Sequence, residues 1–186
     1  MKPRIQILLN LFSAFIAFSV AVGAEPCHVE IRRGPEGFQL LRDGEPFFVK
    51  GAVYWARPDN EAYPLSGVVA HGGNSIRIGG GQLDALVSAA ERLGLAVTIG
   101  IPMKKQREGF DYDDGAAVRK QFEEARAIVM RHKDSPATLI WGVGNELSHG
   151  NVADKTFTNL KVWNAVNDIA KMIREVDPHH PAMTVI

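Results

Sequence analysis

The sequence has one cysteine, no net charge, and no apolar run beyond its N-terminus that is long enough to span a membrane. The single thiol of Cys27 cannot form an intrachain disulfide. The 21 basic and 21 acidic residues balance, which gives no reason to expect a nucleic-acid partner. We interpret Cys27 as an incidental residue near the start of the mature chain, neither a nucleophile nor a lipid-attachment site.

Motifs for nucleotides and metals are also missing. No Gly-x-Gly-x-x-Gly sequence follows the first expected strand, and the Gly79-Gly80-Gly81 cluster lacks the Lys and the Ser or Thr of a phosphate-binding loop. We interpret this cluster as a flexible turn between a strand and a helix. His149 and the adjacent pair His179-His180 have no further ligand at a suitable spacing. We expect neither a metal nor an organic cofactor.

The first 24 residues have the pattern of a secretory signal peptide. Lys2 and Arg4 precede a mostly apolar stretch over 5–22, and Val22-Gly23-Ala24 offers small residues for cleavage. We therefore predict cleavage after Ala24 and export to the periplasm or the cell exterior, which leaves 19 basic and 21 acidic residues. An uncleaved membrane anchor is the alternative, because the stretch approaches the roughly 18 residues needed to span a bilayer.

Residues 25–186 form the predicted domain, in which strand and helix patterns alternate after a short hairpin over 28–48. The hairpin is indicated by an alternating run over 28–32, a turn over 34–37 and a returning run over 38–41, and the turn signal Asp43-Gly44 leads from it to the next strand. Strands are expected over 46–55, 74–78, 95–101, 138–146 and 181–186, and helices over 82–93, 118–132 and 160–176. This alternation indicates parallel strands with right-handed crossovers. The class is α/β, and an open doubly wound sheet is one arrangement that five strands allow.

The last of these helices has a predicted inward face. Its apolar residues at helical spacing are Trp163, Val166, Ala170, Ile173 and Val176. Asp177-Pro178 is expected to end the helix, because the residue before a proline is disfavoured in helical conformation.

The run Thr138-Leu139-Ile140-Trp141-Gly142-Val143-Gly144-Asn145-Glu146 carries the clearest chemical signal. A continuous apolar run is typical of a strand buried on both faces. In a parallel αβ barrel the reactive groups lie at the C-terminal ends of the strands. The run therefore places an amide, Asn145, and a carboxylic acid, Glu146, at the C-terminal end of a strand. A cap for the next helix is the plainer interpretation of the same two residues.

Three segments together resemble a known group of proteins. They are Pro46-Phe47-Phe48-Val49-Lys50-Gly51-Ala52, then Gly73-Asn74-Ser75-Ile76-Arg77, then Ile140 to Glu146. Their order and spacing resemble those of clan A glycoside hydrolases, above all the barrel domain of glycoside hydrolase family 2, with families 5 and 72 as near relatives. The resemblance runs from about residue 38 to the C-terminus.

The resemblance implies a (β/α)8 TIM barrel, of which about the first five strands and an N-terminal β-hairpin are present. It assigns Glu146 as the general acid/base and Asn145 as the group that holds the sugar 2-hydroxyl. Arg77, at the end of the second strand, matches the arginine that supports the catalytic carboxylates. Tyr54 and Trp55 end the first strand, where aromatic rings stack on sugars, although core packing is equally open for Trp55. Trp141 lies within its strand and is expected in the core.

The sequence departs from the family in one respect. The nucleophile of this clan is a glutamate at the end of the seventh strand, and the sequence reaches only the fifth. Residues 25–186 also fall short of the roughly 250 residues of a full barrel. Asp111, Asp113 and Asp114 follow the third strand, but an acidic loop is more often a solvated turn or a helix start. We therefore expect the chain to lack a nucleophile and to be a truncated barrel.

The expected function is that of a secreted, retaining glycoside hydrolase that acts on a β-linked polysaccharide or oligosaccharide. Its expected partner is the carbohydrate substrate, with no nucleic acid and no stable membrane insertion after signal cleavage. A non-catalytic carbohydrate-binding fragment and an inactive truncated barrel are the alternatives. The last strand, over 182–186, would leave an open sheet edge, and such edges favour self-association.

Overall fold

The computed structural model describes residues 26–55, 64–147 and 159–186 of the 186-residue chain. The predicted signal peptide and His149 lie outside the described residues. The chain forms a three-stranded antiparallel sheet followed by a five-stranded sheet with helices against it. Among the described residues no helix is both long and apolar enough to cross a bilayer.

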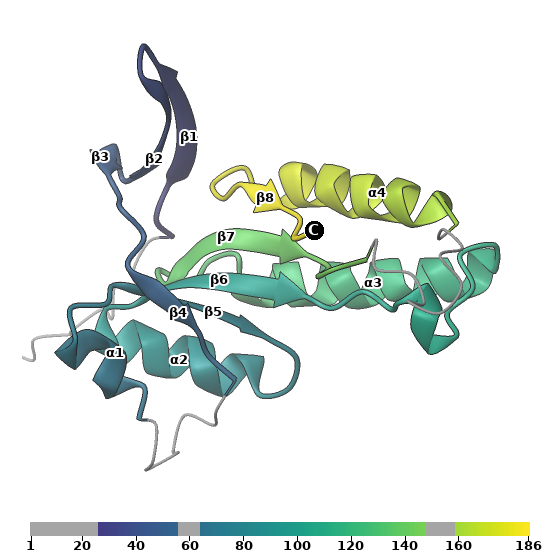
Figure 1. The fold of residues 1–186 in the computed structure, drawn as a ribbon, viewed down its shortest axis with the longest axis horizontal. Coiled ribbons are helices and arrows are strands. Elements are labelled where there is room, and N and C mark those ends of the chain that lie inside the picture. The colour runs from purple at the N-terminus through teal and green to yellow at the C-terminus, as the bar shows by residue number, and fades with distance from the viewer. Residues whose placement is uncertain (1–25, 56–63, 148–158) are drawn as a thin grey trace, which may run out of the picture.

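The antiparallel sheet contains the predicted hairpin. Its strands are β1 (Val29–Gly34), β2 (Gly37–Arg42) and the two-residue β3 (Glu45–Pro46). Asp43 and Gly44 have φ angles of 53° and 83°, the left-handed values that a tight hairpin turn requires. Figure 1 shows the hairpin projecting from the end of the larger sheet at which the parallel strands begin.

The larger sheet is parallel throughout, and its strands follow one another in chain order, β4-β5-β6-β7-β8. They are β4 (Gly51–Val53), β5 (Ser75–Gly79), β6 (Ala96–Ile101), β7 (Thr138–Val143) and β8 (Ala182–Met183). The prediction of an α/β fold with parallel strands is confirmed. Sequential order also separates this sheet from a doubly wound one, in which the strand order reverses at a switch point.

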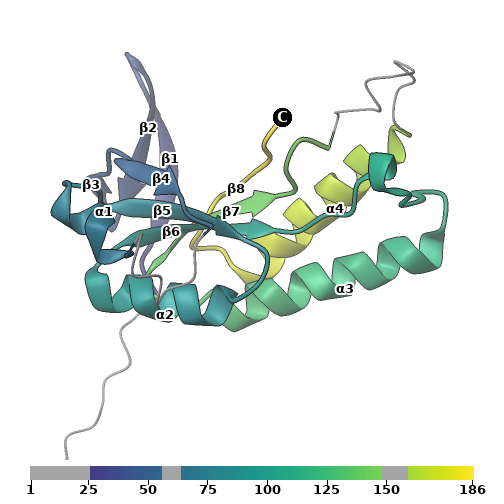
Figure 2. The same cartoon turned by 60° about the horizontal axis from the view of Figure 1, so that its bottom comes forward.

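Helices connect the strands and cover one side of the sheet. They are α1 (Ser66–Ala70), α2 (Leu83–Leu93), the 3₁₀ turn η1 (Gln106–Glu108), α3 (Gly115–His132) and α4 (Lys161–Val176). Figure 2 shows α2 and α3 beneath the sheet, with α4 beside α3. The shared core includes Ile76 and Ile78 of β5 and Leu86 and Ala90 of α2.

Apolar and polar side chains alternate along β5, which places them on opposite faces of the sheet. Ile76 and Ile78 are each 2% exposed and belong to the helix-side core. Successive side chains of a strand point to opposite faces, so Arg77 points to the face away from the helices. That face carries the candidate site.

The prediction of which α4 residues face the core is partly wrong. Only Ile173 of the five predicted residues is fully buried, and the other four are partly buried. The fully buried side chains are Val162, Ala165, Ile169, Met172 and Ile173. Apolar residues cover so much of this helix that periodicity alone leaves its rotation undetermined, and packing against α3 and β7 fixes it.

The interpretation of Cys27 as an incidental residue is also wrong. Its side chain is 5% exposed and packs with Val29, Ala96 and Leu139, so that the segment before β1 closes the end of the sheet where β6 and β7 begin. Sequence distance hid this contact, since Leu139 follows Cys27 by more than a hundred positions.

Candidate active site

The backbone after β7 turns sharply at Gly144. Gly144 has a φ of 71°, and a Cβ built there would lie 2.5 Å from Cδ1 of Leu147. Its N–H donates to the carbonyl of Ile101 at the end of β6 over 3.0 Å. Leu147 is 2% exposed, so the turn is held by a neighbouring strand and by the core. Only glycine combines this φ with this close approach.

Glu146 has an unusual backbone conformation. Its φ is 50°, a left-handed value that costs a residue with a side chain on the order of 1 kcal/mol or more. Its N–H donates to the carbonyl of Val185, which follows β8, over 2.8 Å. The carboxyl group is therefore presented by a backbone that is anchored to the next strand. Strain of this kind is often found at functional sites.

Arg77 contacts Asn145 directly. Its Nη2 donates to Oδ1 of Asn145 over 2.7 Å, across 68 positions of sequence. Arg77 lies on β5, in register with Val53 of β4 and Thr98 of β6. Because the amide oxygen accepts this charged hydrogen bond, the Nδ2 group of Asn145 is oriented as a donor.

The carboxylate of Glu146 lies near a second arginine. Nη2 of Arg107 is 3.9 Å from Oε2, and the Glu146 side chain is 45% exposed. An exposed pair at this distance contributes little to stability. Arg107 belongs to η1, in the loop after β6, and the sequence analysis did not select it. The basic run Lys104-Lys105-Gln106-Arg107 directly after a buried strand could have indicated it.

The two aromatic residues that follow β4 differ in their exposure to solvent. Tyr54 is 7% exposed and belongs to the core cluster, and its N–H donates to the Arg77 carbonyl over 2.8 Å. Trp55 is 74% exposed. Of the two predicted substrate-binding rings, Trp55 has a face accessible from solvent. Trp141 is fully buried, as predicted.

The acidic loop has a structural role. Asp114 caps α3, accepting from the N–H groups of Ala116 and Ala117 over 2.9 and 3.1 Å. Asp113 accepts from Nδ2 of Asn159 over 2.6 Å and pairs with Lys161. These contacts are those of a helix start and a surface turn, the interpretation favoured from the sequence.

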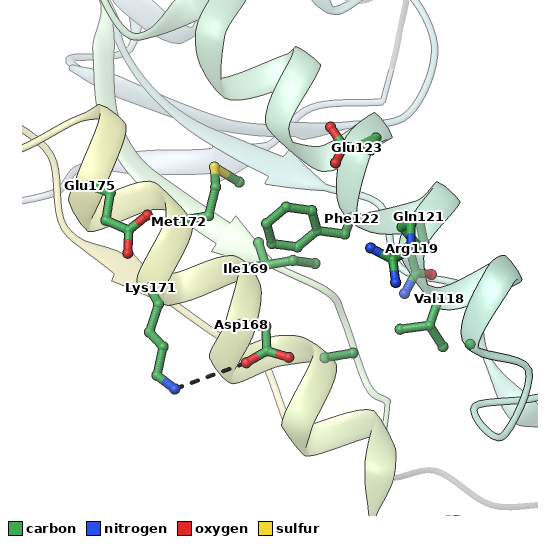
Figure 3. Close-up of a pocket in the computed structure, with 12 residues that line it drawn as sticks. Val118, Arg119, Gln121, Phe122, Glu123, Asp168, Ile169, Lys171, Met172 and Glu175 are labelled. Carbon is green, nitrogen blue, oxygen red and sulfur yellow. Dashed lines mark ion pairs between the residues drawn. The ribbon is translucent and has the colours of Figure 1, made fainter.

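A groove of about 460 Å³ lies between α3 and α4, away from these residues (Figure 3). Phe122, Ile169 and Met172 lie along it, and Lys171 pairs with Asp168 at 4.0 Å on its rim. Its lining includes none of the predicted site residues. Across residues 26–55, 64–147 and 159–186, no three His, Cys, Asp or Glu side chains converge as metal ligands would.

Several solved glycosidases have a similar fold. The β-glucuronidase of Parabacteroides merdae aligns with a TM-score of 0.64 and 20% identity, over 85% of this chain and 20% of that chain. The GH2 β-galacturonidase of Eisenbergiella tayi gives 0.57 and 16%, over 85% and 28%. The exo-chitosanase of Amycolatopsis orientalis gives 0.58 and 17%, over 84% and 19%. This chain shares part of their fold.

These alignments extend over 19–28% of each glycosidase. At such identities the similarity shows the fold alone. No protein-family model and no curated protein sequence matches the chain.

Proposed function

We propose that Asn145 and Glu146 form the acid/base part of a retaining glycoside hydrolase site that acts on β-linked sugars, within the first five strands of a TIM barrel. The hydrogen bond from Arg77 to Asn145 carries this proposal. It orients an amide donor beside a carboxyl group at the C-terminal end of a parallel strand, which is where barrel enzymes place their chemistry. The shared fold with three glycosidases supports it.

Each residue has a distinct role in the proposed reaction. Glu146 protonates the leaving oxygen and later activates water, while the Asn145 amide donates to the sugar 2-hydroxyl, a bond that strengthens in the transition state. Arg77 positions Asn145. Trp55 provides an exposed ring for a sugar face. A retaining site also needs a second carboxylate about 5–5.5 Å away, and we assign it to none of the described residues.

The experiment supplies this second group from solution. The full chain is incubated with phenyl β-glycosides and sodium formate, because formate can attack the anomeric carbon in place of an enzyme carboxylate. The sugars are glucuronide, galacturonide and glucosaminide, following the names of the glycosidases that share the fold. We expect formate-dependent phenol release that falls about 100-fold or more in Glu146→Gln. Glu124→Gln, an exposed change on α3, is the matched control.

Carbohydrate binding without catalysis is a second candidate, favoured by the exposure of Trp55. It predicts saturable binding of β-linked oligosaccharides with no formate-dependent release. Trp55→Ala should then weaken binding, whereas Phe38→Ala should not, although both side chains are 74% exposed. A chain that neither releases phenol nor binds the sugars would contradict both candidates. We also propose that residues 1–24 direct export, which appearance of the protein outside the cytoplasm would test.

A further inference from the structure

A chain of buried polar groups joins the segment before β1 to β7 and to the connection between α4 and β8. Its members are Cys27 before β1, Trp141 within β7, Asp177 at the end of α4, and His180 before β8. Their exposed fractions are 5%, 0%, 2% and 4%, respectively. Asp177 and His180 share the connection between α4 and β8, so three segments that are distant in sequence meet in one solvent-excluded cluster. The proposed glycosidase site uses none of these residues.

Hydrogen bonds run through the whole cluster. Nε1 of Trp141 donates to Oδ2 of Asp177 over 2.7 Å, and the backbone N–H of His179 donates to Oδ1 over 3.0 Å. Nδ1 of His180 lies 2.9 and 3.1 Å from the two carboxylate oxygens. Nε2 of His180 lies 3.6 Å from Sγ of Cys27. The Cys27 thiol donates to the carbonyl of Thr138 over 3.0 Å.

The hydrogen-bond partners along this chain favour a doubly protonated His180 ring. A carboxylate that already accepts two N–H groups is an acceptor toward Nδ1, so Nδ1 carries a hydrogen. The one hydrogen of the Cys27 thiol is directed at the Thr138 carbonyl, so sulfur presents lone pairs to Nε2. A hydrogen on Nε2 would point at these lone pairs, whereas a bare Nε2 would face them with a lone pair of its own. An imidazole ring with two N–H groups is a cation.

The surrounding charges favour this cation. Asp177 is its anionic partner, and a buried cation with a hydrogen-bonded carboxylate is the combination that protein interiors tolerate. Other titratable groups lie on the adjoining elements. His28 and His179 form an edge contact with ring centres 5.9 Å apart, and Arg42 of β2 donates to the Pro136 carbonyl. Burial alone lowers the pKa of His180, but the hydrogen bonds that its ring makes to Asp177 and Cys27 raise it to about 9.

We propose that His180 is a buried imidazolium that fastens the N-terminal segment, through Cys27, to the connection between α4 and β8, through Asp177. The backbone follows the same path, because Val29 N–H donates to the His179 carbonyl over 2.7 Å. Trp141, which donates to Asp177, connects these segments to β7, the strand that ends at the candidate site. We call these four side chains, Cys27, Trp141, Asp177 and His180, the latch.

The protonation state can be observed directly. Long-range ¹⁵N–¹H correlation spectra of the full chain report both ring nitrogens of each histidine. We expect both His180 nitrogens to be protonated from pH 6 to 8 and the ring to lose one of the two protons near pH 9, with His179 as the internal comparison. A neutral His180 tautomer at pH 7 would overturn the proposal. This measurement needs no variant.

Cys27 provides the second readout, because it is the only thiol in the sequence. Its labelling rate by a disulfide reagent is divided by the rate for urea-unfolded protein at the same pH, which removes the intrinsic pH dependence of the thiol. We expect His180→Gln to raise the normalised rate at least ~10-fold at pH 7, since local opening exposes buried groups. The neighbouring His179→Gln should change it less than about 2-fold. Equal normalised rates in the two variants would contradict the proposed role of His180. If His180→Gln does not fold, the ¹⁵N–¹H spectra of the parent chain test the proposal instead.

Discussion

Arg77 donates to Asn145 rather than to Glu146: its Nη2 lies 2.7 Å from the amide oxygen. The arginine therefore acts on the neutral member of the pair and determines which end of the amide faces outward. Glu146 takes its position from the backbone, through the bond of its N–H to Val185 and its φ of 50°. The two adjacent residues are thus oriented by different parts of the sheet, Asn145 by β5 and Glu146 by the segment that follows β8.

Removing the Arg77 side chain should destabilise the fold. A half-buried hydrogen bond to a charged group contributes about 1.5–3 kcal/mol, and Arg77→Ala should lower the free energy of unfolding by about that amount in urea titrations. Arg32→Ala is the control, because its ion pair with Glu30 is exposed and should contribute less than about 1 kcal/mol. Equal losses in the two variants would contradict a specific role for the bond to Asn145.

The turn at Gly144 should not accept a side chain. Gly144→Ala forces a left-handed φ on alanine and drives its Cβ into Leu147, so we expect a loss of about 1–3 kcal/mol in the free energy of unfolding. Gly81→Ala is matched to it, since a Cβ there meets nothing within 4 Å. Thermal unfolding of both variants checks the difference, and an unchanged melting temperature for Gly144→Ala would refute this account of the turn.

The acidic loop should affect stability and not chemistry. Asp114→Ala removes the cap of α3 and should cost about 0.5–2 kcal/mol, whereas Asp114→Asn keeps a capping oxygen and should cost little. Formate-dependent phenol release should be the same in both variants and in the parent chain. Loss of release in Asp114→Asn, with stability retained, would instead assign the carboxylate a chemical role.

Stability should depend on pH through His180. Its pKa is raised to about 9 from an ordinary 6.5, so its stabilising contribution is fully present below pH 6.5 and is lost as the pH rises through 9. The shift corresponds to about 3 kcal/mol. The difference in free energy of unfolding between the parent chain and His180→Gln, measured in urea from pH 6 to 10, should shrink over this window. A difference independent of pH would contradict the assignment.

The opposite sign applies to Asp177. Burial by itself raises the pKa of this carboxyl, but hydrogen bonds from His180 and Trp141 outweigh burial and lower it below 3.8. Its contribution is therefore present above the ordinary pKa of an aspartate and is lost as the pH falls through the lowered value. We expect Asp177→Asn to reduce the acid-induced part of unfolding between pH 5 and 2. An unchanged acid transition in this variant would show that Asp177 does not control it.

Local patterns were enough to predict most of the secondary structure. The helix over 83–93 was expected over 82–93, because its apolar spacing is regular and Gly94 ends it in a left-handed conformation. The strand ending before Asn145 was equally clear from its continuous apolar run. Elements of this kind are determined by neighbouring residues, so their sequences contain the necessary information.

Contacts between segments that are distant in sequence were harder to predict from the sequence. Arg107 reaches Glu146 only because two loops meet beyond the sheet, and the latch joins Cys27 to a histidine 153 positions away. The rotation of α4 depends on which of its many apolar residues face α3. In each case packing in three dimensions decides between arrangements that the local pattern leaves open.

Formate-dependent cleavage of phenyl β-glycosides tests the central claim most directly. The full chain and its Glu146→Gln variant are compared at equal concentration, with Glu124→Gln as the control. The account predicts phenol release that requires formate, falls about 100-fold or more in Glu146→Gln and is unchanged in Glu124→Gln. Release at the same rate from the parent chain and Glu146→Gln would contradict the assignment of Glu146 as the acid/base.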